Sequence, residues 1–337
     1  MRPLANLLFA VGFVIAAGAH AQGATDQHGQ ISEQQAENLL ASVVKVKTRA
    51  LPDARSSASL GPTREGSGVI IDDRGHILTI GYLVIEADAI EVTTAEGKTS
   101  PATLAGYDHA SGFALLRAGL PLGAHFVDLG ASTDLALSEP VMVAPYGGRE
   151  AIHLAYVVSK RQFAGSWEYL LDSAIFISPP TLAWAGSALI SREGKLVGIG
   201  SLLVRDSVEA GVPLPGNMFV PIDLVKPILA DLIDKGRAPG APRPWLGMRT
   251  EEVQGRLFVT RVSTEAPAYR AGIRQGDIIL GVGVDKVTTH AELYKKLWSL
   301  GPAGIEVSLK VLQGASVNEI KVRSIDRIEY FRVKPVL

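Results

Sequence analysis

Few side chains in this chain could act as a nucleophile with a base in reach. The 337 residues include 7 His and no Cys, so thiol nucleophiles, disulfides and zinc–thiolate sites are excluded. Ser187, in a Gly-containing turn, carries the hydroxyl that a displaced nucleophile would need. Each candidate base stands alone in the sequence, and a lone His is more often a packed or surface residue than a catalyst. These candidates are His76, His109, His125 and His153.

The residue pattern gives no support to metal, cofactor or nucleic-acid chemistry. Asp72, Asp73 and His76 lack the spacing of a ligand set, and no cofactor motif occurs. We therefore expect no metal and no cofactor. The chain has 33 basic and 34 acidic residues and no basic stripe, which argues against nucleic acid or anionic lipid as a partner.

Three segments resemble the catalytic segments of trypsin-like serine proteases of the HtrA/Deg family. Residues 66–84 resemble the strands that lead to the family's T-x-x-H-V-V, and Tyr82 stands at the His. Residues 111–116 resemble T-D-L-A-L-L, and Gly112 stands at the Asp. Residues 183–189 resemble G-N-S-G-G-P-L, and Ala185 stands at the nucleophilic Ser. The resemblance therefore covers the segments around the catalytic positions of the protease but not the catalytic residues themselves.

The three replacements remove the chemistry that such a frame performs. Ala185 has no hydroxyl, and Gly112 has no side chain to orient a base. The phenol of Tyr82 would be a poor general base, because a Tyr pKa is ordinarily about 10. Loss of a complete triad lowers turnover by about 10⁶-fold. We therefore expect no catalytic residue and interpret the chain as a pseudoprotease.

The segments that position these residues are predicted to form mainly β-strands. Short β-type runs separated by Gly, Asp and Ser turns extend from residue 43 to about residue 203, as in an antiparallel barrel or sandwich. Residues 66–78 and 186–199 form two similar strand–turn–strand units. The resemblance implies a chymotrypsin-like double β-barrel over residues 37–236. A short helix over residues 37–42 should precede the first strand, and a helix from an Asp223 N-cap to Gly236 should close the domain.

The N-terminus has the pattern of a secretory signal peptide over residues 1–21. Arg2 precedes an apolar stretch over residues 4–17, and residues 19–21 form an A-x-A cleavage site. The stretch is shorter than the roughly 20 residues that a spanning helix needs. The sequence therefore predicts export to the periplasm through a cleaved leader, without a stable membrane anchor. Residues 22–36, rich in Gln, Gly and Ser, read as a mobile arm.

The C-terminal third resembles the PDZ domain attached to HtrA proteases. A Pro-rich linker over residues 237–244 precedes this domain at residues 245–325, and residues 326–337 form a tail. A capping box at residues 289–292 opens a helix that runs to Leu300. In the resemblance, backbone N–H groups of one loop capture a peptide C-terminus, whose last side chain enters a pocket beside that helix. The candidate peptide-binding residues are Leu246, Gly247, Met248, Leu293 and Leu297.

Three functions remain open from the sequence. The first is a non-catalytic binder of unfolded proteins or peptide C-termini in periplasmic protein quality control, as the resemblance implies. The second is a serine endopeptidase with residual or displaced catalytic residues, which requires Ser187 to react. The third is a non-catalytic subunit that regulates an active HtrA relative. The resemblance also implies a trimer, either of identical chains or mixed with such a relative.

Overall fold

The structure, a computed structural model, describes residues 32–123 and 125–331. The predicted leader and residues 22–31 of the predicted arm therefore lie outside the described residues. Helix α1 (Glu33–Ala41) begins earlier than the expected residue 37. The reason is a capping box, in which the Ser32 hydroxyl accepts from the Gln35 N–H and the Gln35 side chain accepts from the Ser32 N–H.

The first six strands close into a barrel in the order β1-β2-β3-β6-β5-β4. All neighbouring pairs are antiparallel, and β2 and β3 form the first of the two similar hairpins expected from the sequence. The strands are β1 (Val43–Ala50), β2 (Thr63–Ile70), β3 (His76–Ile80), β4 (Ala87–Thr93), β5 (Thr99–Tyr107) and β6 (Phe113–Ala118).

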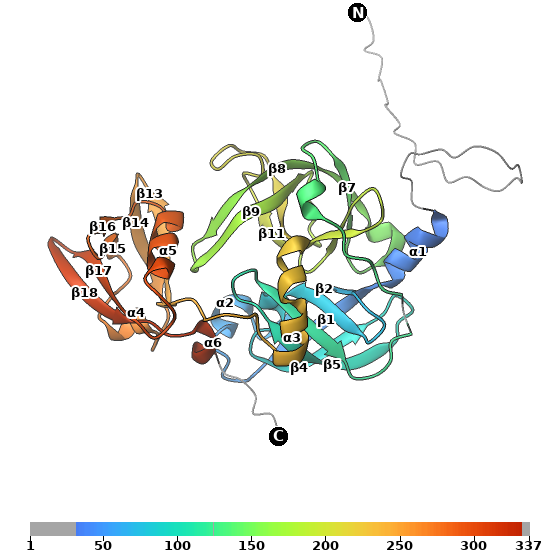
Figure 1. Ribbon diagram of the computed structural model, residues 1–337, viewed down its shortest axis with the longest axis horizontal. Coiled ribbons are helices and arrows are strands. Elements are labelled where there is room, and N and C mark those ends of the chain that lie inside the picture. Colours follow the sequence, from blue (N-terminus) through green and yellow to red (C-terminus); the bar gives the residue numbers. More distant parts are fainter. Residues whose placement is uncertain (1–31, 124, 332–337) are drawn as a thin grey trace, which may run out of the picture.

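A second barrel of the same size follows, in the order β10-β11-β12-β9-β8-β7. The hairpin of β10 and β11 is the second copy of the repeated unit. The hairpin of β8 and β9 extends well beyond the barrel wall toward the C-terminal domain (Figure 1). The strands are β7 (Pro140–Ala144), β8 (His153–Gly165), β9 (Tyr169–Ser178), β10 (Ala188–Ile190), β11 (Leu196–Val204) and β12 (Gly216–Pro221).

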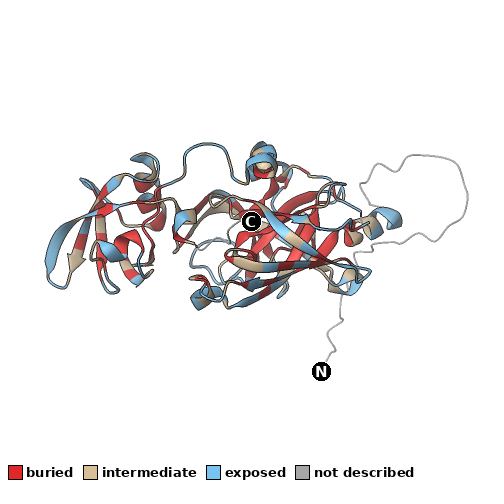
Figure 2. Cartoon of the chain, turned by 90° about the horizontal axis from the view of Figure 1, so that it is seen from below, coloured by how far each residue is buried: buried red, intermediate tan, exposed pale blue. Residues whose placement is uncertain are grey.

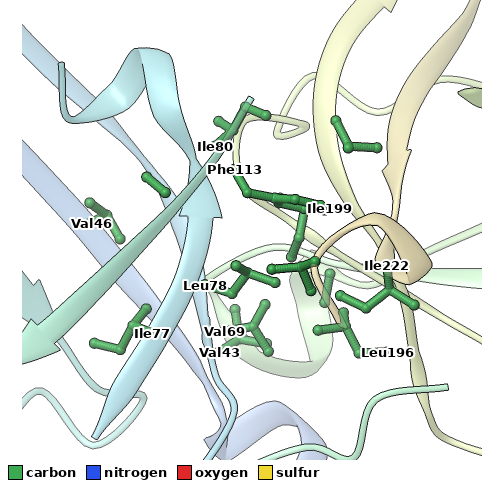
Figure 3. Close-up of a cluster of buried hydrophobic side chains, with 14 of the residues drawn as sticks. Val43, Val46, Val69, Ile77, Leu78, Ile80, Phe113, Leu196, Ile199 and Ile222 are labelled. Carbon is green, nitrogen blue, oxygen red and sulfur yellow. The ribbon is translucent and has the colours of Figure 1, made fainter. Parts of the chain in front are cut away.

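One continuous hydrophobic cluster joins the two barrels (Figure 3). Val43 and Val69 of the first barrel belong to the same cluster as Leu196, Ile199 and Ile222 of the second. All five side chains are buried, so separating the barrels would expose apolar surface at about 25 cal/mol per Å². This shared core holds the segments between the barrels in fixed positions.

Short helical segments connect and close the two barrels. The helix expected from Asp223 is broken, because Pro227 lacks the N–H that would bond to the Asp223 carbonyl and continue the helix. The Asp223 carboxylate instead accepts from the Ser132 hydroxyl and the Thr133 N–H. Gly236 ends the last helix in the left-handed conformation, as predicted. The segments are α2 (Ser57–Leu60), η1 (Gly81–Leu83), η2 (Ser132–Asp134), η3 (Gly148–Ala151), η4 (Ile222–Leu224), η5 (Lys226–Ile228) and α3 (Leu229–Lys235).

The C-terminal domain is an antiparallel sheet in the order β13-β14-β15-β17-β18, with β16 paired to β15. Its long helix α5 opens with the predicted capping box of Thr289 and Glu292. Helix α6 lies in the segment expected to be a tail. The strands are β13 (Met248–Val253), β14 (Arg256–Val262), β15 (Ile278–Val282), β16 (Asp285–Lys286), β17 (Glu306–Gln313) and β18 (Ser316–Arg323), and the helices are α4 (Pro267–Arg270), α5 (His290–Ser299) and α6 (Arg327–Tyr330).

The mainly β fold expected from the sequence is confirmed, with both barrels followed by the PDZ-like sheet. Buried segments gather inside each barrel and on the inner face of the C-terminal sheet, whereas the far end of that sheet is exposed (Figure 2). Over the described residues, no helix combines the length and apolar character that crossing a membrane requires.

Candidate functional site

The structure brings the three protease-like positions to one cavity of about 780 Å³. Tyr82, Gly112 and Ala185 all line it, although they come from three segments far apart in the sequence. Gly247 and Met248 of the C-terminal domain also line it, so the cavity lies between the barrels and that domain. The three protease-like positions are therefore gathered in space, and two of the predicted peptide-binding residues line the same cavity.

Tyr82 is fixed as a hydrogen-bond donor. It lies in η1 directly after β3, and its phenol donates to the Ser201 carbonyl at 2.8 Å. Burial raises the pKa of this phenol above its ordinary value. The phenol is therefore protonated at neutral pH and cannot act as a general base at this position.

Gly112 sits in a turn whose backbone conformation and close neighbour disfavour a side chain. Its φ is +82°, a conformation that favours glycine. A Cβ at this position would lie 3.3 Å from the hydroxyl of Tyr169. That hydroxyl donates to the carbonyl of the preceding residue, Ser111, at 2.5 Å. The aromatic residue at the start of β9 thus occupies the space beside position 112.

Several polar groups of the turn around Ala185 are paired in internal hydrogen bonds. The Ala185 carbonyl accepts from the Ser67 N–H at 2.8 Å, and the Gly186 N–H donates to the Gly200 carbonyl at 2.9 Å. The Ala183 N–H donates to the Thr181 hydroxyl at 3.2 Å. A donor that is already paired does not point toward a developing oxyanion.

Ser187, the candidate displaced nucleophile, is fully buried. Its hydroxyl donates to the Trp184 carbonyl at 2.9 Å, and its N–H donates to the same oxygen at 3.1 Å. The side chain therefore points into its own turn, away from the cavity that Ala185 lines.

Two of the candidate bases, His76 and His153, are hydrogen-bonded to groups other than a candidate nucleophile. The His76 ring bonds to the Asp72 carboxylate at 2.6 Å, and the His153 ring bonds to the Pro179 carbonyl at 2.9 Å. Across the described part of the chain, no His side chain is hydrogen-bonded to a Ser or Thr hydroxyl. The same residues hold no group of three or more His, Asp or Glu that could bind a metal ion.

His109 is the exception, because the structure places it at the cavity wall. Its ring lies 3.0 Å from the Tyr107 hydroxyl and 2.7 Å from the guanidinium of Arg327. Burial and the Arg327 charge hold the pKa of His109 well below its ordinary value. The sequence offered only a lone His in a loop and gave no sign that α6 returns to contact it.

A carboxylate lies in the loop for which peptide binding is predicted. Glu168, between β8 and β9, accepts from the N–H groups of Leu246, Gly247 and Met248 at 2.9, 2.7 and 3.1 Å. Its Oε2 takes the first of these bonds, and its Oε1 takes the other two. Burial raises the pKa of the Glu168 carboxyl to about 7, against the lowering effect of the three N–H groups and of Arg327.

The residues of the predicted pocket lie in a hydrophobic cluster that also includes a residue of β9. Met248, Leu293 and Leu297 belong to the buried cluster of the C-terminal domain, and Leu170 of β9 belongs to that same cluster. Sequence reasoning missed Glu168 and Leu170, because each looks like an ordinary residue of a β-hairpin.

Two further hydrogen-bonding groups fix the hairpin between β13 and α5. The Tyr294 hydroxyl donates to the Gly165 carbonyl at 2.7 Å and accepts from the Glu168 N–H at 3.1 Å. The Thr250 N–H of β13 donates to the Ser166 carbonyl at 3.2 Å. The hairpin thus contacts both walls of the groove in which a peptide would lie.

Comparison with known proteins gives the same two-part division. The family described as "Trypsin-like peptidase domain" matches residues 66–199, and the one described as "PDZ domain" matches residues 244–323. The chain is 27% identical over 277 residues to a probable periplasmic serine endoprotease DegP-like of Hahella chejuensis, covering 76% of this chain and 56% of the relative. It is 25% identical over 273 residues to the periplasmic serine endoprotease DegP of Escherichia coli K12, covering 75% and 55%. The chain thus spans about half the length of these relatives.

Solved structures agree in fold. The structure described as HtrA-type protease AlgW with tripeptide has a TM-score of 0.52 at 19% identity, covering 90% of this chain and 99% of that chain. The serine endoprotease from Yersinia pestis has a TM-score of 0.50 at 22% identity, covering 88% and 98%. At these identities the likeness establishes the architecture, a trypsin-like domain followed by a PDZ domain.

Proposed function

We propose that this HtrA/DegP-type chain, in which one PDZ domain follows a trypsin-like domain, binds polypeptides without cutting them. The observation that carries the proposal is the wall of the shared cavity. At the three positions gathered there stand a phenol held as a donor, a glycine and a methyl group. None of them can attack a carbonyl, take a proton from a hydroxyl or orient an imidazole.

The alternative of a displaced serine nucleophile finds little support. Ser187 would have to leave a buried turn and break its bond to the Trp184 carbonyl before it could meet a substrate. A nucleophile also needs a base within hydrogen-bond reach, and within the described ranges no His holds such a position beside Ser187.

The proposed binding site is the groove between β13 and α5 of the PDZ domain. Its loop offers three converging N–H groups at residues 246–248, which suit a free carboxylate. Its pocket contains Met248, Leu293 and Leu297, which suit an aliphatic last side chain. The proposed ligands are therefore the C-termini of unfolded or damaged polypeptides.

The proposed place of action is the periplasm, reached through cleavage of the leader at residues 1–21. The leader pattern supports export, and the curated relatives named above are described as periplasmic. A trimer, of identical chains or with an active relative, is proposed with the same role in quality control.

The test is capture of unfolded casein by the chain without residues 1–21. Size-exclusion chromatography should show a complex that contains intact casein. Absence of a complex, both for this chain and for a Glu168→Ala variant with the loop vacated, would overturn the binding role. Casein fragments that disappear in a Ser187→Ala variant would instead overturn the non-catalytic role.

A further inference from the structure

The tip of the β8–β9 hairpin, residues 165–170, occupies the groove in the way an external peptide would. A peptide that adds to a PDZ groove needs a carboxylate in the N–H loop, main-chain contact with the neighbouring strand and a side chain in the pocket. The tip supplies all three. Glu168 provides the carboxylate, Ser166 accepts a main-chain hydrogen bond from Thr250 of β13, and Leu170 joins the apolar cluster of the pocket.

Each oxygen of the Glu168 carboxylate has a hydrogen-bond donor in the loop. Both of its oxygens accept N–H groups, and the side chain is almost wholly buried, with 3% of the residue exposed. A buried carboxylate persists only where hydrogen bonds replace its water. In the loop, three N–H groups do so, and Arg327 adds a favourable positive charge.

The backbone of the tip adopts a conformation that serves this contact. Glu168 has a φ of +60°, which is uncommon for a residue with a side chain. Such a conformation persists where surrounding contacts hold it, and here Tyr294 bonds both to the Gly165 carbonyl and to the Glu168 N–H. Contacts from the PDZ domain therefore hold the tip in its unusual turn.

We propose that the tip is an internal ligand that closes the PDZ groove, and that an external C-terminus with an aliphatic last residue must displace it. This proposal rests on the proposed binding function and deepens it, because it names both the gate and the chemistry of the competitor. Leu170 belongs to the same apolar cluster as Met248, Leu293 and Leu297, which favours an aliphatic last side chain such as Leu. Apparent affinity then equals the affinity of the open groove multiplied by the fraction of molecules with the tip released.

Displacement has a consequence for the other half of the cavity. Tyr169 follows Glu168 directly, and its hydroxyl holds the turn before Gly112. Trp167 stacks on Tyr169 with ring centroids 5.9 Å apart. Release of the tip from the PDZ loop therefore also loosens the contacts beside position 112, which links peptide capture to the trypsin-like domain.

The test measures peptide binding and loop protection in the same set of proteins. The proteins are the chain without residues 1–21, Glu168→Gln, Glu168→Ala and the control Asp172→Asn. Asp172 is an exposed carboxylate on the same hairpin. The probe is a fluorescein-labelled decapeptide with a free C-terminal Leu, compared with its C-terminal amide by fluorescence anisotropy. Hydrogen exchange of the segment over residues 244–250 is followed without peptide, and circular dichroism verifies that each variant is folded.

The proposal predicts at least about tenfold tighter binding of the free-acid peptide by both Glu168 variants. In Glu168→Gln, an amide nitrogen replaces one of the accepting oxygens and cannot accept from a loop N–H, whereas a protonated carboxyl keeps an accepting lone pair at that position. The tip is therefore released by this substitution although the shape is kept. Exchange of the 246–248 amides should accelerate in both variants, and Asp172→Asn should match the parent chain.

The outcomes separate this proposal from the binding function beneath it. Equal, measurable binding in all four proteins would retain peptide binding and overturn the gate. Faster exchange in the Glu168 variants without any peptide binding would retain the gate and overturn the proposed ligand. Unchanged exchange together with unchanged binding in folded Glu168 variants would overturn the internal-ligand proposal outright.

Discussion

Glu168 and Tyr169 are consecutive residues whose side chains reach two regions, the proposed peptide-binding loop and the turn beside Gly112. The Glu168 carboxylate lies 2.7 Å from the Gly247 N–H in the peptide-binding loop. The Tyr169 hydroxyl lies 2.5 Å from the Ser111 carbonyl, next to Gly112 at the protease-like site. One hairpin tip therefore occupies both regions, and neither can open fully without affecting the other.

The first prediction concerns pH. Burial raises the pKa of Glu168 to about 7 in the closed groove, whereas a solvent-exposed Glu has an ordinary pKa of about 4.3. Closure therefore takes up a proton between these values, so the closed state gains stability as pH falls from 8 to 5 and loses it as pH rises. Peptide affinity should increase by roughly tenfold from pH 5.5 to pH 8, because the peptide carboxylate stays ionised throughout.

Other titratable groups surround Glu168, and the control accounts for them. Arg327 of α6 and Tyr294 of α5 keep one protonation state over this range, and His109 stays neutral because its pKa is held well below the ordinary value. In Glu168→Gln, affinity measured by anisotropy should therefore be nearly independent of pH. An equal slope in parent and variant would assign the pH dependence to another group.

A second prediction concerns the Tyr294 hydroxyl. Tyr294→Phe leaves the Gly165 carbonyl and the Glu168 N–H without their partner in a buried site. An unsatisfied buried group costs about 1–3 kcal/mol, so the closed state should weaken by about that amount. The expected result is tighter peptide binding together with faster exchange at residues 165–168. Tyr269→Phe is the matched control, since Tyr269 is 40% exposed; similar effects of both substitutions would contradict the account.

The third prediction separates the loop geometry from simple glycine strain. Gly247 and Gly255 have φ values of +83° and +68°, so an alanine at either site costs about 1–2 kcal/mol in backbone strain. A Cβ at residue 247 would also lie 2.3 Å from the Ala266 Cβ, whereas a Cβ at residue 255 meets nothing within 4 Å. Gly247→Ala should therefore abolish peptide binding in the Glu168→Ala background. Gly255→Ala in that background should bind as before, and equal losses in both would refute a specific role of the loop.

A fourth prediction concerns repair of the catalytic positions. Ala185→Ser alone should give no cleavage, because no imidazole accompanies it at residue 82. The triple change Tyr82→His, Gly112→Asp and Ala185→Ser should also remain far below an active relative. At residue 112 the φ of +82° and the nearby Tyr169 hydroxyl oppose a correctly placed Asp. Casein cleavage beside the DegP of Escherichia coli measures this, and turnover close to that of DegP would contradict the reason given.

The architecture was anticipated by the family resemblance together with local sequence patterns. The capping box at Thr289 and Glu292 marked the start of α5, and the similar hairpins marked both barrels. Two features that the sequence does show were not used in predicting the helix bounds. The capping box at Ser32 starts α1 early, and Pro227 interrupts the closing helix.

Occupation of the groove could not be predicted from the sequence. Glu168 is separated from Leu246 by 78 residues, and a single Glu in a hairpin carries no mark of a buried partner. Its contact depends on how the PDZ domain lies against the second barrel. That arrangement depends in part on α6, where Arg327 donates to the Trp167 carbonyl at 3.1 Å. Long-range docking of this kind leaves no local pattern.

The most direct test of the account as a whole is cleavage of unfolded casein by the purified chain without residues 1–21. A Ser187→Ala variant and the Glu168→Ala variant are followed beside it, because the second removes the internal ligand from the groove. The account predicts intact casein in all three samples over many hours. Cleavage by the parent chain that is lost in Ser187→Ala would contradict it and establish Ser187 as a nucleophile.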